Sequence, residues 1–242
     1  MHVELFIAGW LTAPAGVIRA GADMHEPFRF PVPAYVIETG TERILLDTGP
    51  HPSAMADPDG FYGRPGALGP FSGEQEDCIA DLLDVDTITR VVLTHLHYDH
   101  AGGLPLIPAR VPVVLQRAEW AAGHDDAAIT RNHFLPRDYA GTDRPVELVD
   151  GEHDLLGDGS VILLPTPGHT PGHQSVRMGD LVIGGDVTHL ATGLDDLRLP
   201  VFGDDLEAQA RSAERLRALR DSGRTVLPGH DPAVLRAGPV RV

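Results

Sequence analysis

Residues 94–103 of this chain have the sequence THLHYDHAGG, and they directly follow a short apolar run. Three histidines and one aspartate, His95, His97, Asp99 and His100, lie here within six residues. Imidazole nitrogens and carboxylate oxygens are good ligands for zinc, iron, cobalt and manganese in proteins. An apolar strand that ends in a turn containing glycine lets such closely spaced side chains converge. The segment therefore predicts a metal site at the end of a buried strand.

Three other segments also place histidine or aspartate directly after an apolar strand. Residues 165–173 have the sequence PTPGHTPGH, residues 184–186 are GGD, and residues 228–231 are PGHD. Each of them contains glycine where the backbone must turn tightly. We therefore expect strand ends from distant parts of the chain to contribute to one metal centre.

The composition limits the class of protein. The 242 residues, 42% of them hydrophobic, suffice for one large α/β domain with a sizeable core. A formal net charge of −16 disfavours nucleic acid and anionic membranes as partners. No run approaches the roughly 18–20 apolar residues that cross a bilayer, and the N-terminus lacks the pattern of a signal peptide, so we expect a cytoplasmic location. The single cysteine, Cys78, permits no internal disulfide and no cysteine-based zinc site.

Apolar and alternating runs predict a series of short strands separated by helices and loops. The expected strands are residues 3–7, 34–38, 43–47, 90–94, 113–116, 146–149, 161–164, 174–177, 181–183 and 225–227. Helices are expected at residues 117–122 and 205–221, and a capping-box pattern at Ser72 predicts another through about Leu83. Residues 50–72 and 123–145 are rich in glycine, proline or polar side chains and are expected to be loops.

Two parts of the chain resemble each other weakly. Residues 35–49 and 175–186 each predict a strand, a glycine turn and a second strand that ends in aspartate. Each part continues with a helix and an apolar strand that ends in histidine. This predicts a single domain, residues 1–242, with two similar halves at about 1–150 and 151–242. The halves would pack sheet to sheet with their helices outside.

The ordered set of motifs resembles the metallo-β-lactamase superfamily over nearly the whole chain. The resemblance implies an α/β fold, the four-layer αββα sandwich. It also implies two divalent metal ions, zinc in the first place, with iron, cobalt or manganese as alternatives. The implied ligands are His95, His97 and His169 for one ion, Asp99, His100 and His230 for the other, and Asp186 between the two.

Within the superfamily, the chain is most similar to the N-acyl homoserine lactonases. The similar segments include residues 30–33, 116–120 and 166–175. This similarity implies a quorum-quenching enzyme that opens an N-acyl homoserine lactone or a related lactone by attack of a metal-bound hydroxide. Those lactonases usually carry a tyrosine three residues after the bridging aspartate, whereas this chain has His189.

Several side chains have expected roles around such a site. Asp99 is expected to pass a proton to the leaving group, and His189 to donate a hydrogen bond to the oxyanion. Asp47 is expected to orient a ligand histidine rather than to bind metal itself. His173 is expected to have a structural hydrogen-bonding role, and residues 23–28 could form a loop over the pocket.

Other functions of the same scaffold remain open. The alternatives are a thioester hydrolase of glyoxalase II type, a phosphodiesterase, a β-lactamase and a diiron redox protein. The acidic charge disfavours a nuclease, and the chain has no lysine or evident arginine cluster for the carboxylates of glutathione. The expected partner is a small lactone or ester substrate, with no nucleic acid and no membrane, and the expected assembly is a monomer or homodimer.

Overall fold

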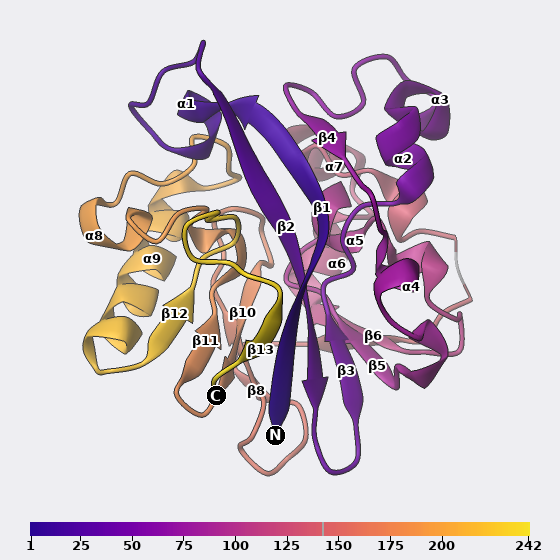
Figure 1. Cartoon of the computed structure of the whole chain (residues 1–242), viewed down its shortest axis with the longest axis vertical. Coiled ribbons are helices and arrows are strands. Elements are labelled where there is room, and N and C mark those ends of the chain that lie inside the picture. The colour runs from indigo at the N-terminus through magenta and orange to yellow at the C-terminus, as the bar shows by residue number, and fades with distance from the viewer. Residues whose placement is uncertain (142) are drawn as a thin grey trace.

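The computed structural model describes residues 1–141 and 143–242, which form two β-sheets packed face to face with helices on both outer sides (Figure 1). The first sheet has eight strands in the order β13-β1-β2-β3-β5-β6-β7, with β4 also paired to β1. The second sheet has five strands in the order β12-β11-β10-β9-β8. This arrangement confirms the predicted four layers.

The strands have the following bounds. The first sheet contains β1 (His2–Pro14), β2 (Pro27–Glu38), β3 (Arg43–Leu46), β4 (Ser72–Glu74), β5 (Arg90–Val92), β6 (Val113–Gln116), β7 (Val146–Val149) and β13 (Gly238–Val240). The second sheet contains β8 (His153–Asp154), β9 (Ile162–Pro165), β10 (Gln174–Met178), β11 (Leu181–Ile183) and β12 (Thr225–Leu227). The chain passes from the first sheet to the second between β7 and β8, which is where the sequence suggests the boundary between the two halves. That the halves arose by duplication stays a prediction.

The helices are mostly short. They are α1 (Ala15–Ile18), α2 (Pro52–Ala56), α3 (Pro58–Tyr62), α4 (Ile79–Leu82), α5 (Tyr98–Ala101), α6 (Arg117–Ala122), α7 (Asp126–Asn132), α8 (Gly193–Asp196) and α9 (Leu206–Asp221). Single 3₁₀ turns are η1 (Val85–Thr87), η2 (Leu104–Leu106), η3 (Pro136–Asp138) and η4 (Gly185–Val187). No helix among the described residues is long and apolar enough to span a membrane.

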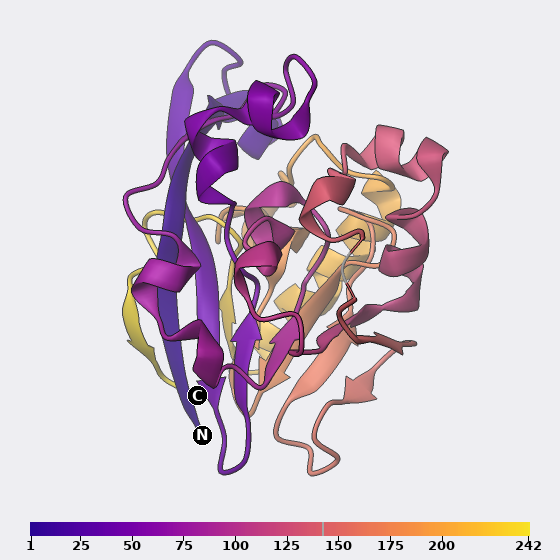
Figure 2. The same cartoon turned by 90° about the vertical axis from the view of Figure 1, so that its right-hand side faces the viewer.

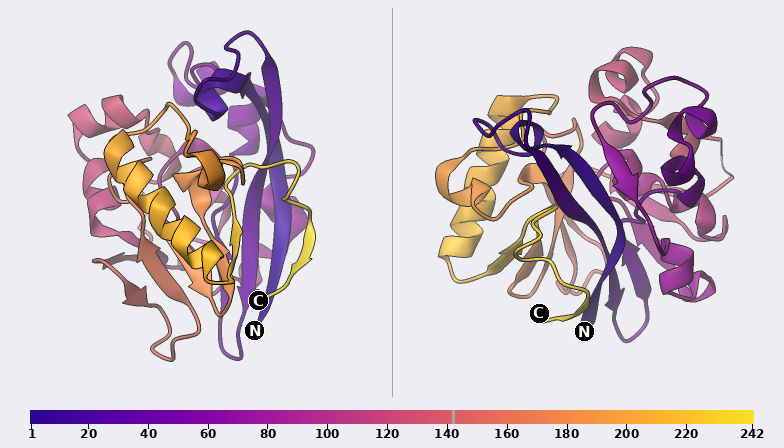
Figure 3. Two further views of the ribbon diagram at one scale, coloured as in Figure 1. Left: turned by 90° about the vertical axis from the view of Figure 1, so that its left-hand side faces the viewer. Right: turned by 45° about the horizontal axis from the view of Figure 1, so that its top comes forward.

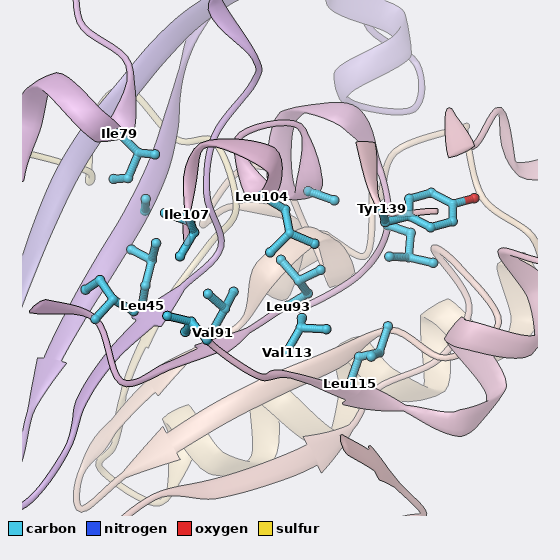
Figure 4. Packing of buried hydrophobic residues seen from close by; sticks show 14 of the residues in the cluster. Leu45, Ile79, Val91, Leu93, Leu104, Ile107, Val113, Leu115 and Tyr139 are labelled. Atoms are coloured by element: carbon cyan, nitrogen blue, oxygen red, sulfur yellow. The ribbon is translucent and has the colours of Figure 1, made fainter. Parts of the chain in front are cut away.

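Strand β2 is buried on both faces and shows how the layers are held together. Tyr35 and Ile37 belong to the core between the two sheets, where they pack in one cluster with Val176 of β10. Ala34 and Val36 point the other way and join the core beneath the helices, because successive side chains of a strand alternate between its faces. Figure 4 shows this second core.

The outer helices cover the two sheets from opposite sides. Helices α4 to α7 contribute buried side chains to the core over the first sheet, and they face the viewer in Figure 2. Helix α9 lies on the outer side of the second sheet (Figure 3). Its N-cap is Asp205, whose carboxylate accepts a hydrogen bond from the amide of Ala208, and its residues Ala213 and Leu216 pack in one cluster with Val182 of the second sheet.

The direction of the strands determines where the functional segments lie. Strands β3, β5 and β6 run parallel, so the residues that follow them meet at one edge of the first sheet. Strands β11 and β12 also run parallel, which brings residues 184–186 and 228–231 together at one edge of the second sheet. Polar residues after adjacent parallel strands converge in this way in many α/β proteins.

The prediction of one helix from Ser72 through Leu83 is wrong. Residues 72–74 instead form β4, which pairs with Trp10–Thr12 of β1, and only α4 is helical. The amide of Cys78 donates to Asp81, so the capping box lies at Cys78 rather than at Ser72. Pairing with a strand distant in sequence outweighs the local helix signal.

The predicted loops are more ordered than their composition suggests. Residues 50–72 contain α2 and α3, each with a proline in its first turn and a side-chain cap. Residues 123–145 contain α7, which Asp125 caps, although residue 142 lies outside the described residues. Strand β13, which pairs antiparallel with β1, was not predicted from the sequence.

Candidate metal centre

The segment after β5 turns directly into a helix. His97 is the N-cap of α5 and has an extended backbone, and Asp99 and His100 lie in the first turn that follows. A side chain at Gly103 would place its Cβ 2.3 Å from the carbonyl oxygen of Thr48, so glycine is required where α5 packs against the loop after β3. Strand, turn and glycine together bring the four ligand-type residues to one point.

His95, His97 and His169 form the first of two groups of side chains that could hold a metal ion, and we call these groups the ligand sets. The distance from His95 Nε2 to His97 Nδ1 is 2.9 Å, and that from His97 Nδ1 to His169 Nε2 is 3.0 Å. The outward-facing ring nitrogens lie within hydrogen-bond distance of neutral oxygens: Thr94 Oγ1 at 3.0 Å, the carbonyl of Asn132 at 2.9 Å and the carbonyl of Phe202 at 3.2 Å. When the outer nitrogen of each ring donates its hydrogen to one of these oxygens, the inner nitrogen keeps a free lone pair. The three lone pairs point towards one position, where they could bind a cation.

The first set is electrically neutral. Burial lowers the pKa of His95 and His169 well below the ordinary value of histidine, and it lowers the pKa of His97 to about 4. Neutral imidazole is the form that binds metal. The environment therefore keeps this set in its ligand form at neutral pH.

Asp99, His100 and His230 form the second ligand set, which is rich in negative charge. Asp99 Oδ2 lies 3.7 Å from His100 Nε2 and 3.5 Å from His230 Nε2. His100 Nδ1 donates to Asp47, and His230 Nδ1 donates to the carbonyl of Pro31. Burial lowers the pKa of both histidines, but the charge of Asp186 and further carboxylates outweighs burial and raises it overall.

Asp186 lies between the two sets. Its Oδ2 is 3.5 Å from His169 Nε2 and 3.2 Å from His230 Nε2, while Oδ1 is 3.5 Å from His100 Nε2. Among the described residues, Asp186 Oδ1 and His100 Nε2 have no hydrogen-bond partner although both atoms are buried. Because a buried polar atom without a partner is costly, the donor set as a whole fits bound cations.

Tight backbone packing fixes Asp186 in place. Its amide donates to His173 Nε2 at 3.0 Å, which is a hydrogen-bonding role of the kind expected for His173. A Cβ at position 229 would lie 2.2 Å from Asp186 Oδ1, so a larger residue there would displace the carboxylate. Glycine at this position lets the carboxylate lie between the two sets.

Asp47 lies behind the second set. Its Oδ1 accepts from the Thr94 amide at 2.7 Å, and its Oδ2 accepts from the Thr94 hydroxyl and from His100 Nδ1, both at 2.8 Å. Its backbone φ of +58° is unusual for a non-glycine residue. Asp47 belongs to none of the candidate metal-binding groups, and it contacts a ligand histidine as expected.

His189 lies at the pocket side of Asp186. Its Nε2 is 3.2 Å from Asp186 Oδ2, and its ring centroid is 5.1 Å from that of His230. With His169 and Asp186 it forms a further group that could hold a metal. Its Nδ1, however, is buried without a hydrogen-bond partner among the described residues. The histidines of the two ligand sets differ from His189, because the outer nitrogen of each has an oxygen within hydrogen-bond distance.

A cavity of about 340 Å³ opens onto this centre. Its polar side includes Asp99, His189 and His230, and its apolar side includes Phe30, Leu68 and Phe71. Residues 66–71 form much of the wall. The cavity is thus mostly apolar, with a cluster of polar groups at one end, as in many small-molecule sites.

The loop predicted to cover the pocket is not part of this wall. Met24 is 54% exposed, and neither Met24 nor Phe28 lines the cavity. Residues 66–70, His133 and Phe202 also line the cavity and were not predicted from the sequence. Their signal in the sequence is weak: Phe71, which directly follows residues 66–70, is an aromatic residue in a segment expected to be a loop.

Comparisons with known proteins agree with this arrangement. Residues 27–230 match the model of the metallo-β-lactamase superfamily. The N-acyl homoserine lactonase AttM of Azorhizobium caulinodans is 30% identical over 230 residues, which cover 88% of this chain and 84% of the relative. The N-acyl homoserine lactonase AiiA of Bacillus thuringiensis subsp. kurstaki is 29% identical over 214 residues, with coverage of 83% and 81%.

Solved structures support the same fold. An N-acyl homoserine lactone hydrolase with N-hexanoyl-L-homoserine at its catalytic metal centre has a TM-score of 0.84 at 24% identity, covering 98% of this chain and 96% of that one. AidC, a dizinc quorum-quenching lactonase, has a TM-score of 0.67 at 17% identity, covering 95% and 88%. Because the superfamily model spans most of its length, this chain belongs to the metallo-β-lactamase superfamily.

Proposed function

We propose that this chain is a two-metal hydrolase that opens lactone rings, with N-acyl homoserine lactones as its substrate class. The observation that carries the proposal is the pair of buried ligand sets, joined by Asp186, that opens onto a mostly apolar cavity. The curated relatives named N-acyl homoserine lactonases support the choice of substrate.

The ligand sets would each hold one ion, with Asp186 contacting both, and zinc suits such histidine and carboxylate donors. Two divalent ions held in this way would activate water at neutral pH and polarise the ester carbonyl. Asp99 would pass a proton to the departing alkoxide, and its position in the cavity wall supports this role. His189, also in the cavity wall, would donate a hydrogen bond to the oxyanion in place of a tyrosine.

The character of the cavity favours a neutral substrate with an acyl chain. Among the described residues, its wall contains no lysine or arginine side chain. A glutathione thioester carries carboxylates that would remain unpaired there, which argues against a hydrolase of glyoxalase II type. The apolar wall around Leu68 and Phe71 offers the surface that an acyl chain requires.

An assay with a pH indicator tests this proposal directly. The metal-loaded protein is given an N-acyl homoserine lactone, a glutathione thioester and a β-lactam in parallel. We expect acid release from the lactone, and far slower release from the lactone with an Asp186→Ala variant. Cleavage of the thioester with the lactone left intact would overturn the proposal. The native metal, the cytoplasmic location and the monomeric or homodimeric state stay predictions.

A further inference from the structure

Glu119 is a buried acid that contacts the loops of the first ligand set. It lies in α6 with no exposed surface. Its Oε1 accepts from the amide of Leu96 at 2.9 Å. Its Oε2 accepts from the Thr170 hydroxyl and from the Gly172 amide, both at 2.8 Å. Leu96 lies between His95 and His97, and Thr170 directly follows His169, so one carboxylate connects the loops that carry all three histidines.

The loop after β9 packs directly on the backbone of α6. A Cβ at Gly172 would lie 2.1 Å from the backbone nitrogen of Glu119, which leaves room for no side chain. Next to this contact, Gln116 donates to Gln174, and Gln174 donates to the carbonyl of Leu93. Strand β5, strand β10 and the start of α6 are therefore tied together beside the first set.

Only a carboxylate satisfies the three donors that surround Glu119. The Leu96 and Gly172 amides can only donate, and they approach different oxygens of the side chain. A glutamine in either orientation would turn its NH₂ group towards one of these amides and leave that amide unpaired. Burial raises the pKa of Glu119, the three hydrogen bonds lower it, and the net result is a pKa of about 7.

We propose that Glu119 is a positioning residue that holds the His95–His97 loop and the His169 loop at the separation at which the three imidazoles bind one metal. Asp47 supports the second set in a comparable way, except that its carboxylate accepts a hydrogen bond directly from a histidine of that set, His100. The inference rests on the proposed metal centre and is independent of the substrate.

The test compares Glu119→Gln with Asp138→Asn by metal binding. Asp138 is a matched control because it is also a fully buried acid, but among the described residues its carboxylate accepts hydrogen bonds only from the Tyr62 hydroxyl. Zinc affinity is measured by competition with a chelator, and the coordination of each site by the absorption of bound cobalt. For Glu119→Gln we expect one of two metals to bind about 10- to 100-fold more weakly with an altered cobalt spectrum. Asp138→Asn should retain both metals.

A second pair of variants keeps the test valid if Glu119→Gln fails to fold. Thr170→Val removes one donor to Glu119, whereas Thr170→Ser keeps a hydroxyl at the same place. We expect the valine variant to weaken the same metal less than Glu119→Gln does, and the serine variant to restore binding. Equal metal affinity in Glu119→Gln and the unsubstituted protein, or in both Thr170 variants, would overturn the inference. Failure of the unsubstituted protein to bind metal would instead overturn the proposed function.

Discussion

The two ligand sets are built from similar side chains but sit in opposite electrical environments. In the first set, the histidines donate to neutral oxygens, and burial keeps their pKa low. In the second set, His100 donates to Asp47, both histidines face Asp99 and Asp186, and their pKa is raised. The carboxylates that offset the charge of two cations are therefore concentrated on one side.

This difference indicates that the two sites depend on different properties. Metal binding by the neutral first set depends on geometry. Its three imidazoles can bind one ion only when the two loops that carry them are held at the right separation. The charged set depends on electrostatics, because its carboxylates attract a cation even before the geometry is complete. Removing a support should therefore have a local effect, whereas removing the shared aspartate should affect both sites.

Replacing the shared residue should have the largest effect. In an Asp186→Ala variant we expect loss of tightly bound metal from both sets and a fall in lactone hydrolysis of about a thousandfold or more, since the carboxylate lies within 3.5 Å of inner nitrogens from both sets, those of His169, His100 and His230. Metal analysis after reconstitution and the pH-indicator assay measure the two effects. Two tightly bound metals in this variant would contradict the role of Asp186.

An Asp47→Asn variant tests whether the charged set is supported independently. Asparagine has one acceptor oxygen in place of two, so it cannot accept from the Thr94 amide and from His100 together, and the connection between the β5 loop and His100 is broken at one of these contacts. We expect one metal to bind about 10- to 100-fold more weakly, and the other to bind as before. Chelator competition measures both affinities, and an equal loss at both sites would show that the two sets are not separable.

His189 should affect turnover rather than metal content. An Ala substitution removes a hydrogen-bond donor beside Asp186, and we expect a fall in kcat of about 10- to 100-fold with two metals retained. His189→Tyr introduces the residue typical of the lactonases and should retain more of the kcat. Loss of metal in His189→Ala would make this histidine a ligand, and unchanged turnover would leave it without a catalytic role.

Asp138 gives the smallest effect and lies outside both ligand sets. Burial raises its pKa to about 8, so the folded chain keeps a proton that the unfolded chain releases above its ordinary pKa of 3.8. The stability that this group contributes is therefore lost as the pH rises through about 4 to 8. Asparagine does not titrate, so the Tm of Asp138→Asn relative to the unsubstituted protein should rise by a few degrees between about pH 5 and pH 8. A Tm difference independent of pH would contradict this.

The parts of the site that could be predicted from the sequence are the ligand segments at strand ends. Residues 94–103 carry four ligand-type side chains on one short segment, and the strand before them is apolar. The parallel pairing of β3 with β5 places Asp47 next to the segment after β5, and the parallel pairing of β11 with β12 brings residues 184–186 and 228–231 together. The bounds predicted from the apolar runs are confirmed for four strands, β6, β7, β11 and β12.

The parts that could not be predicted depend on contacts between distant segments. Strand β4 exists because residues 72–74 pair with β1, and the local capping signal does not reveal that partner. The wall formed by residues 66–71 and Phe202 joins two loops that lie far apart in sequence. Glu119 likewise has no local signal of its role, since its donors follow β5 and β9.

The pairing of β13 with β1 places the two chain termini side by side. Val3 pairs with Val240, and the cavity residue Phe30 pairs with Leu11, eight residues further along β1. At about 3.3 Å per residue, roughly 26 Å of strand separates the termini from that wall of the cavity. A short linker could therefore join residue 242 to residue 1, and new ends could be opened in an exposed loop. Such a circularly permuted chain, or one with a fusion partner at either end, should keep its substrate entrance unobstructed.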